Sequence, residues 1–161
     1  MQLRSYRPSD LDAMVALDDL CFEEAFRFSR AEMRRYAEAK RARVVVAESG
    51  AMLAGFCILQ VERAAGGPVA YVVTLDVRPE LRRQGLASRL MLAAAEQVRR
   101  DGCRWMVLHV YTGNAAAIGF YERLGFEVVG TVKGFYGPGR DALAMRAALP
   151  LCGDPPPVLG L

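Results

Sequence analysis

The sequence predicts a single domain of mixed α and β structure, in which a central sheet with antiparallel and some parallel pairing is flanked by about four helices. Its 161 residues, 53% of them hydrophobic, suit one domain with one core. Two β-rich runs, at residues 44–47 and 52–59, are joined by Ser49-Gly50 and predict an antiparallel hairpin. After residue 70, predicted strands and helices alternate, which favours some parallel pairing.

The N-terminal part of the chain predicts a short strand and then two helices. Ser9, with Asp12 three residues later, forms an N-terminal capping pattern ahead of apolar residues at helical spacing. Ser29 and Glu32 repeat this pattern, and the second helix should end near residue 40.

The rest of the chain predicts four strands and two helices. In chain order they are a strand at 70–77, a helix at 85–100, a strand at 105–110, a helix at 114–124, and strands at 126–132 and 142–146. Asp101-Gly102 and Gly125 are favoured helix ends.

Residues 1–149 should form this domain, and residues 150–161 a proline-rich C-terminal tail. The three consecutive prolines at 155–157 lack backbone N–H groups, so we expect the tail to be loose and outside the sheet.

Charge and hydropathy exclude several classes of protein. The formal net charge is +3, too small to indicate a nucleic-acid binder, which usually has a concentrated basic face. The longest apolar runs fall well short of the roughly 20 residues of a membrane span, and the N-terminus does not resemble a signal sequence. We therefore expect a cytoplasmic protein, monomeric or homodimeric, with no nucleic-acid or membrane partner.

The four cysteines, Cys21, Cys57, Cys103 and Cys152, are widely spaced, and the chain has one histidine. Neither a metal site nor a disulfide framework is predicted from this pattern. Cys21, Cys57 and Cys103 should be core residues, with a cysteine nucleophile as the alternative.

An arginine-rich segment lies between a predicted strand and a predicted helix. Its residues are Arg82, Arg83, Gln84, Gly85, Leu86, Ala87 and Ser88. The free N–H groups at a helix N-terminus bind anions, Gly85 and Ala87 leave those groups accessible, and the arginines add charge-assisted contacts. By itself the segment could equally be a simple helix cap. It lacks the three glycines of a Rossmann site and the Gly-Lys-Ser/Thr of a Walker loop.

Two separate segments of the sequence resemble the GNAT superfamily of acetyltransferases. Leu75-Asp76-Val77-Arg78-Pro79 followed by Arg82-x-x-Gly85-x-Ala87 resembles its motif Q/R-x-x-G-x-G/A. The run from Asn114-Ala115 to Gly125-Phe126 resembles its N-A-x-A-I-x-F/L-Y-x-x-x-G-F block. Residues 1–149 are most similar to the protein N-terminal acetyltransferases, including those of the ribosomal-protein-alanine type.

The resemblance implies a fold, a co-substrate and contacts. The sheet should be mixed, mostly antiparallel, and splayed between its fourth and fifth strands. Acetyl-CoA should be the acyl donor, without a metal. Its pantetheine arm should pair with the backbone of Leu75 and Val77, its pyrophosphate should bind residues 83–88, and Asn114 should contact it.

His109, at the end of the fifth strand, is a candidate base, because an imidazole pKa near ~6.5 suits proton transfer near neutral pH. It could equally be a structural residue. Some enzymes of the superfamily have glutamate at this position. A related branch has Leu-His-Val here and a Tyr-x-x-Thr-Leu strand, which matches residues 71–75, so Tyr71 and His109 are predicted to act together through water.

By the same resemblance, Tyr121 should contact the cofactor sulfur and donate a proton to the departing thiolate. The bulky residues around it could instead make it part of the core.

The acceptor should be a primary amine. A protein or peptide N-terminal α-amine, with a pKa near ~8, is more readily neutral than a lysine near ~10.4. Aromatic residues expected to grip it, each of which could be simple packing, are Phe22, Phe26, Phe28, Phe135 and Tyr136. The alternatives are a small amine such as a polyamine, amino acid or drug, and a CoA-binding module without catalysis.

Overall fold

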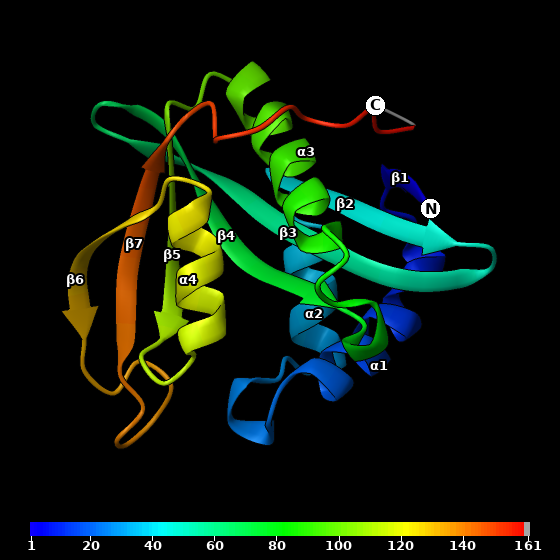
Figure 1. The fold of residues 1–161 in the computed structure, drawn as a ribbon, viewed down its shortest axis with the longest axis horizontal. Coiled ribbons are helices and arrows are strands. Elements are labelled where there is room, and N and C mark those ends of the chain that lie inside the picture. The colour runs from blue at the N-terminus through cyan, green and yellow to red at the C-terminus, as the bar shows by residue number, and fades with distance from the viewer. Residues whose placement is uncertain (160–161) are drawn as a thin grey trace.

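The structure is a computed structural model, and it describes residues 1–159. Seven strands form one sheet in the order β1-β2-β3-β4-β5-β7-β6 (Figure 1). The strands are β1 (Gln2–Ser5), β2 (Ala42–Ser49), β3 (Met52–Ala64), β4 (Gly67–Val77), β5 (Trp105–Tyr111), β6 (Glu127–Val132) and β7 (Ala142–Ala148). The helices are α1 (Leu11–Cys21), α2 (Arg30–Ala37), α3 (Leu86–Arg100) and α4 (Ala115–Arg123), with 3-10 turns η1 (Pro8–Asp10), η2 (Glu24–Phe26) and η3 (Pro79–Leu81).

The sheet is mostly antiparallel, and β4 and β5 are its parallel pair. These two strands pair only at Ala70 with Met106 and at Tyr71 with Val107. Beyond these residues they diverge, so the edge of β4 from Val72 to Val77 has no partner in β5. The predicted splay between the fourth and fifth strands is therefore confirmed.

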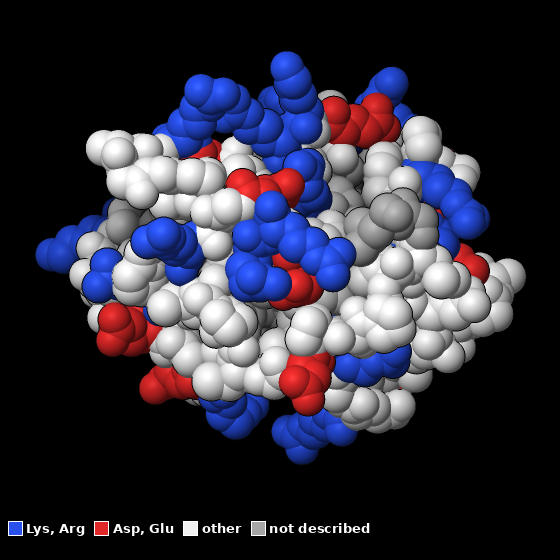
Figure 2. All heavy atoms as spheres, turned by 90° about the horizontal axis from the view of Figure 1, so that it is seen from above, with Lys and Arg blue, Asp and Glu red and all other residues white. Residues whose placement is uncertain are grey.

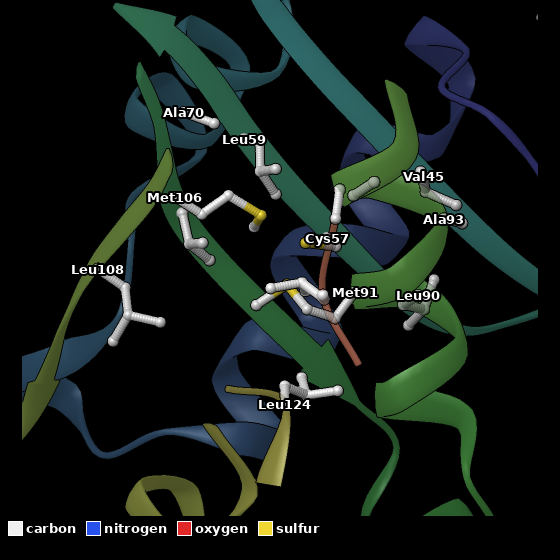
Figure 3. Close-up of a cluster of buried hydrophobic side chains, with 14 of the residues drawn as sticks. Val45, Cys57, Leu59, Ala70, Leu90, Met91, Ala93, Met106, Leu108 and Leu124 are labelled. Atoms are coloured by element: carbon white, nitrogen blue, oxygen red, sulfur yellow. The ribbon is translucent and has the colours of Figure 1, made fainter. Parts of the chain in front are cut away.

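The helices cover both faces of the sheet, with α3 and α4 on one face and α1 and α2 on the other (Figure 1). The larger core cluster lies between the sheet and α3, where Leu90 and Met91 meet Cys57 and Met106 (Figure 3). A second cluster packs α1 and α2 against the opposite face, around Phe56. The two faces are called the α3 face and the α1 face below.

A β-bulge in β4 changes which residues point to which face. Leu59 pairs with Val72 and Ile58 with Thr74, so Val73 is the extra residue. Before the bulge, Val72 packs into the α3-face cluster, and after it Leu75 does so. Thr74 and Asp76 consequently point to the α1 face.

The start of α2 matches its prediction, and the start of α1 does not. Ser29 Oγ accepts the Glu32 N–H at 3.1 Å, and the Glu32 carboxylate accepts the Ser29 N–H at 2.9 Å. Ser9 is not a cap, because it lies inside η1. The Asp10 carboxylate closes that turn instead, because it accepts the Arg7 N–H at 2.8 Å. It also forms an ion pair with Arg4 at 2.7 Å.

The prediction of a loose tail outside the sheet was wrong for its described part. The Ser5 N–H donates to the Leu159 carbonyl at 3.1 Å, and the Leu159 N–H donates to the Leu3 carbonyl at 3.0 Å. Leu159 thereby forms a parallel bridge with Arg4. Leu151 is buried in the core, so apolar residues on either side of the prolines hold the tail against the domain.

Basic and acidic side chains lie among each other on the face seen in Figure 2. Several arginines are paired, such as Arg43 with Asp101 at 2.8 Å and Arg99 with Glu96 at 2.7 Å. Within residues 1–159, no helix has the length and apolar character needed to cross a membrane.

Candidate active site

Tyr71 and His109 lie on the α1 face, on two strands that have just begun to diverge. Ala70 and Val72 are buried on the α3 face, so Tyr71, between them in the alternating strand, points the other way. Leu108 and Val110 place His109 on the α1 face by the same alternation.

The two side chains form a hydrogen-bonded pair. The Tyr71 hydroxyl lies 2.8 Å from Nδ1 of His109. Partial burial lowers the pKa of His109 below its usual value, and burial raises the pKa of Tyr71 to about 12. At neutral pH the imidazole is therefore neutral and the phenol protonated, and the pair can take up a proton. The predicted association of these two residues is present in the structure.

Three of the five predicted acceptor aromatics gather beside His109. The Phe135 ring stacks on the imidazole with centroids 4.2 Å apart, and the Tyr136 hydroxyl donates to the His109 carbonyl at 3.1 Å. Phe26, from η2, lies 5.0 Å from Tyr136 and 5.2 Å from Tyr111, centroid to centroid. Tyr111 was not among the residues predicted for this site, although alternation along β5 places it on the same face as His109.

Phe22 and Phe28 are not brought to this cluster. Phe28 packs into the α1-face core, with its ring 5.4 Å from that of Tyr36. Phe22 is half-buried, and its carbonyl accepts a hydrogen bond from Arg27. Phe28 is therefore a packing residue, which was the alternative considered for each of the five predicted acceptor aromatics.

The predicted anion site lies at the N-terminus of α3. Gly85 is the N-cap residue with φ of 80°, and Arg83 also has a positive φ, 63°. No side chain within the described residues caps the helix, and its backbone ladder starts only when Arg89 N–H bonds to Gly85 O. The amide groups of the first turn are thus free to bind an anion.

The residues of the predicted anion site differ in the groups that they can present to an anion. Arg83, Gln84 and Gly85 are exposed, while Ala87 and Ser88 are half-buried. The side chain of Leu86 belongs to the core, so Leu86 offers only its N–H group.

Arg82, one of the two arginines expected to add charge-assisted contacts to the anion, donates its Nε–H to the Val77 carbonyl at 3.2 Å. The same carbonyl accepts the Cys21 thiol at 3.3 Å. In this structure the Val77 carbonyl therefore has protein partners where a pantetheine contact was predicted.

Tyr121 and Asn114 lie at the two ends of α4. Tyr121 packs against the α3-face core, with ring centroids 5.2 Å from Phe120 and 5.6 Å from Phe126. Burial raises the pKa of its phenol, which keeps the proton on it. Asn114 Oδ1 accepts the Ala117 N–H at 3.1 Å and so caps α4.

The cysteines occupy mostly core positions. Cys57 and Cys103 are buried, Cys21 is half-buried and Cys152 is exposed. Burial raises the thiol pKa of Cys57, Cys103 and Cys21, which disfavours the nucleophilic thiolate. Among residues 1–159, no group of three or more His, Cys, Asp or Glu side chains is arranged to hold a metal ion.

The model of the acetyltransferase (GNAT) family matches residues 11–126. The chain belongs to the GNAT acetyltransferase family. It is therefore an acyltransferase. The splayed sheet and the open N-terminus of α3 fit acetyl-CoA, which GNAT enzymes use as acyl donor.

Among relatives of this GNAT chain, the N-alpha-acetyltransferase daf-31 of Caenorhabditis elegans is 29% identical over 160 residues, which span 92% of this chain and 83% of the relative. N-alpha-acetyltransferase 20 of Dictyostelium discoideum is 43% identical over 82 residues, which span 50% of this chain and 47% of the relative.

Solved structures share the fold over almost the whole chain. The ribosomal-protein-S18-alanine N-acetyltransferase of Escherichia coli has a TM-score of 0.80 and 25% identity, covering 94% of this chain and 96% of its own. A chain of the NatC complex bound to Gag peptide and CoA has a TM-score of 0.79 and 20% identity, covering 92% and 99%.

Proposed function

We propose that this protein transfers an acetyl group from acetyl-CoA to the α-amine of a protein or peptide N-terminus. The observation that carries the proposal is the hydrogen-bonded pair of Tyr71 and His109 at the divergence of β4 and β5. Acetyl-CoA supplies the reactive thioester when bound. The remaining chemistry belongs to side chains on the two faces of the sheet.

On the α1 face, the pair removes a proton from the incoming ammonium group. His109 is neutral at physiological pH because burial lowers its pKa, and the Tyr71 hydroxyl holds the ring through Nδ1. An α-ammonium group with a pKa near ~8 gives up its proton more readily than a lysine near ~10.4. The pair is therefore better matched to an N-terminus than to a lysine.

On the α3 face, the first turn of α3 and the end of α4 hold the donor and complete proton transfer. The free amides of α3, with exposed Arg83, suit a pyrophosphate. The edge of β4 beyond Tyr71, which has no partner in β5, offers backbone groups to the pantetheine arm. Tyr121 keeps its proton at neutral pH and is assigned to protonate the departing thiolate.

The surroundings of His109 favour a peptide acceptor. Its neighbours are aromatic rings from η2 and from the bend between β6 and β7, among them Phe26, Phe135 and Tyr136. A site for a polyamine would need carboxylates instead. The names of the relatives, which act as N-alpha-acetyltransferases, support the same conclusion.

Incubation with acetyl-CoA and a panel of short peptides tests the proposal. Each peptide is offered with a free and with a blocked N-terminus, and one carries a lysine. Acetylation of free N-termini alone supports the proposal. Transfer only to polyamines, amino acids or drugs indicates a small-molecule enzyme, and CoA binding without transfer to any amine indicates a non-catalytic module.

A further inference from the structure

Two carboxyl groups lie buried against each other on the α1 face, where α1 packs against β4. Asp18, in α1, has 0% of its surface exposed, and Asp76, in β4, has 1%. Neither takes part in the chemistry proposed above. Buried carboxyl groups are costly unless every oxygen has a partner.

Each carboxyl group has one oxygen with a donor from the protein. Asp18 Oδ2 accepts the backbone N–H of Phe28 at 2.8 Å, and Asp76 Oδ1 accepts the Thr74 hydroxyl at 2.5 Å. The other two oxygens, Asp18 Oδ1 and Asp76 Oδ2, are buried without a donor among the described residues. The two side chains interact with each other, and because two ionised carboxylates offer no donor, a hydrogen bond between them requires one shared proton.

The environment decides which group carries that proton. Burial and the neighbouring charge of Asp18 raise the pKa of Asp76 well above its usual value, and burial raises that of Asp18 less strongly. Asp76 therefore holds the proton and donates it to Asp18. The other ionisable groups facing the pair are Asp19, Cys21, Arg27, Cys57, Arg82 and Tyr121. The two arginines favour the charge that stays on the pair.

We propose that Asp18 and Asp76, sharing one proton, are positioning residues that fasten the acceptor-binding link, residues 22–28, to the donor-binding strand β4. The connection runs from the Phe28 N–H through Asp18 to Asp76, between the two β4 residues predicted to contact pantetheine, Leu75 and Val77. Phe26, two residues before Phe28, contacts Tyr111 and Tyr136 beside His109. Displacement of the link therefore moves Phe26, which is proposed to contact the acceptor peptide.

The inference rests on the proposed function only in assigning the link to the acceptor. Asp76→Asn gives a direct test, because an amide N–H can donate to Asp18 but cannot ionise. Asp76→Ala removes the donor and leaves the Asp18 charge unpaired. Asp12→Ala, at an exposed α1 residue paired with Arg30, is the matched control.

In steady-state kinetics, we expect Asp76→Asn and Asp12→Ala to keep wild-type KM values for peptide and acetyl-CoA at pH 7. Asp76→Ala should raise the peptide KM about tenfold, as expected for loss of one charged hydrogen bond, and change the acetyl-CoA KM much less. At alkaline pH the wild-type peptide KM should rise as the shared proton is lost, whereas that of Asp76→Asn should not show this rise. Equal loss of activity in the Asn and Ala variants, or an unchanged peptide KM in Asp76→Ala, would overturn the proposal.

Amide hydrogen exchange tests the connection between the link and β4 without any turnover, so the experiment remains informative if no amine is acetylated. Protection of the Phe28 amide should fall in Asp76→Ala and persist in Asp76→Asn and Asp12→Ala. If Asp76→Ala does not fold, Asp18→Asn takes its place. Its Oδ1 can accept from Phe28 while its Nδ2 donates to an ionised Asp76, so Phe28 protection should become insensitive to alkaline pH. Phe28 protection that is the same in every folded variant at every pH contradicts the proposal.

Discussion

The hydroxyl of Tyr71 lies 2.8 Å from Nδ1 of His109, on the face of the sheet opposite to Tyr121. This relationship separates the group assigned to take a proton from the group assigned to give one. The two faces communicate where β4 and β5 diverge, after the pair Tyr71–Val107. An amine approaching from the α1 face can thus meet a thioester held from the α3 face.

His109→Ala should lower kcat by about 10²- to 10⁴-fold, the usual contribution of a positioned base. Because burial lowers the His109 pKa, the acid limb of the wild-type kcat/KM, where the imidazole gains a proton, should lie below the ordinary imidazole pKa of ~6.5. This acid limb should be absent in His109→Ala. The pH dependence of kcat and of kcat/KM, measured for the wild type and for His109→Ala, checks the two expectations.

Tyr71→Phe should also lower kcat, because it removes the hydroxyl that holds His109. Tyr6→Phe is the control, since it removes a hydroxyl bonded to Glu38, away from the sheet divergence. Equal kcat in Tyr71→Phe and Tyr6→Phe would contradict a role for the pair.

Tyr121→Phe should lower kcat by at least about tenfold and leave CoA affinity unchanged, because only the proton for the thiolate is lost. The ring contacts with Phe120 and Phe126 remain, so the melting temperature should change little. Steady-state kinetics combined with calorimetric CoA titration separates the two effects. Full activity of Tyr121→Phe would reassign the acid.

Gly85→Ala should weaken CoA binding. With φ of 80° at this position, a Cβ strains the backbone by about 1–2 kcal/mol and disturbs the start of α3. Gly50→Ala, at φ of 60° in the turn between β2 and β3, imposes similar strain away from α3, and neither Cβ meets an atom within 4 Å. Both variants should lose similar stability in urea unfolding, but calorimetry should show weaker CoA binding only for Gly85→Ala. Equal CoA affinities in the two variants would argue against an anion site at the N-terminus of α3.

Gly55→Ala should destabilise the protein by about 1–3 kcal/mol, the typical cost of overpacking. A Cβ at residue 55 lies 2.7 Å from the carbonyl oxygen of Asp76, a backbone atom that cannot move without disturbing β4. Gly66→Ala adds a Cβ that meets nothing within 4 Å. Urea unfolding should therefore separate the two variants, and equal stability would show that β4 can shift at no cost.

Much of the fold and part of the site could be predicted from local sequence patterns. The turn at Ser49-Gly50, the cap formed by Ser29 and Glu32, and the helix start at Gly85 depend on neighbouring residues, so short motifs suffice. The Tyr71–His109 pair came from a family likeness and is formed across two strands.

Other features depend on contacts between residues far apart in the chain. The bulge at Val73, which turns Asp76 toward Asp18, is set by pairing with β3 and leaves no mark in the apolar pattern. Arg82 was expected at the anion from its position in a motif, and that motif gives no sign of the hydrogen bond that its Nε donates to the Val77 carbonyl. Leu159 joins β1 through residues more than 150 positions away.

Transfer to the α-amine is tested most directly by mass-spectrometric mapping of the acetyl group on a peptide that carries both a free α-amine and a lysine, with wild-type protein and His109→Ala. We expect acetylation of the α-amine by the wild type, a strong reduction in His109→Ala, and an unmodified lysine side chain. Acetylation of the lysine alone, or equal α-amine acetylation by both proteins, would contradict this expectation.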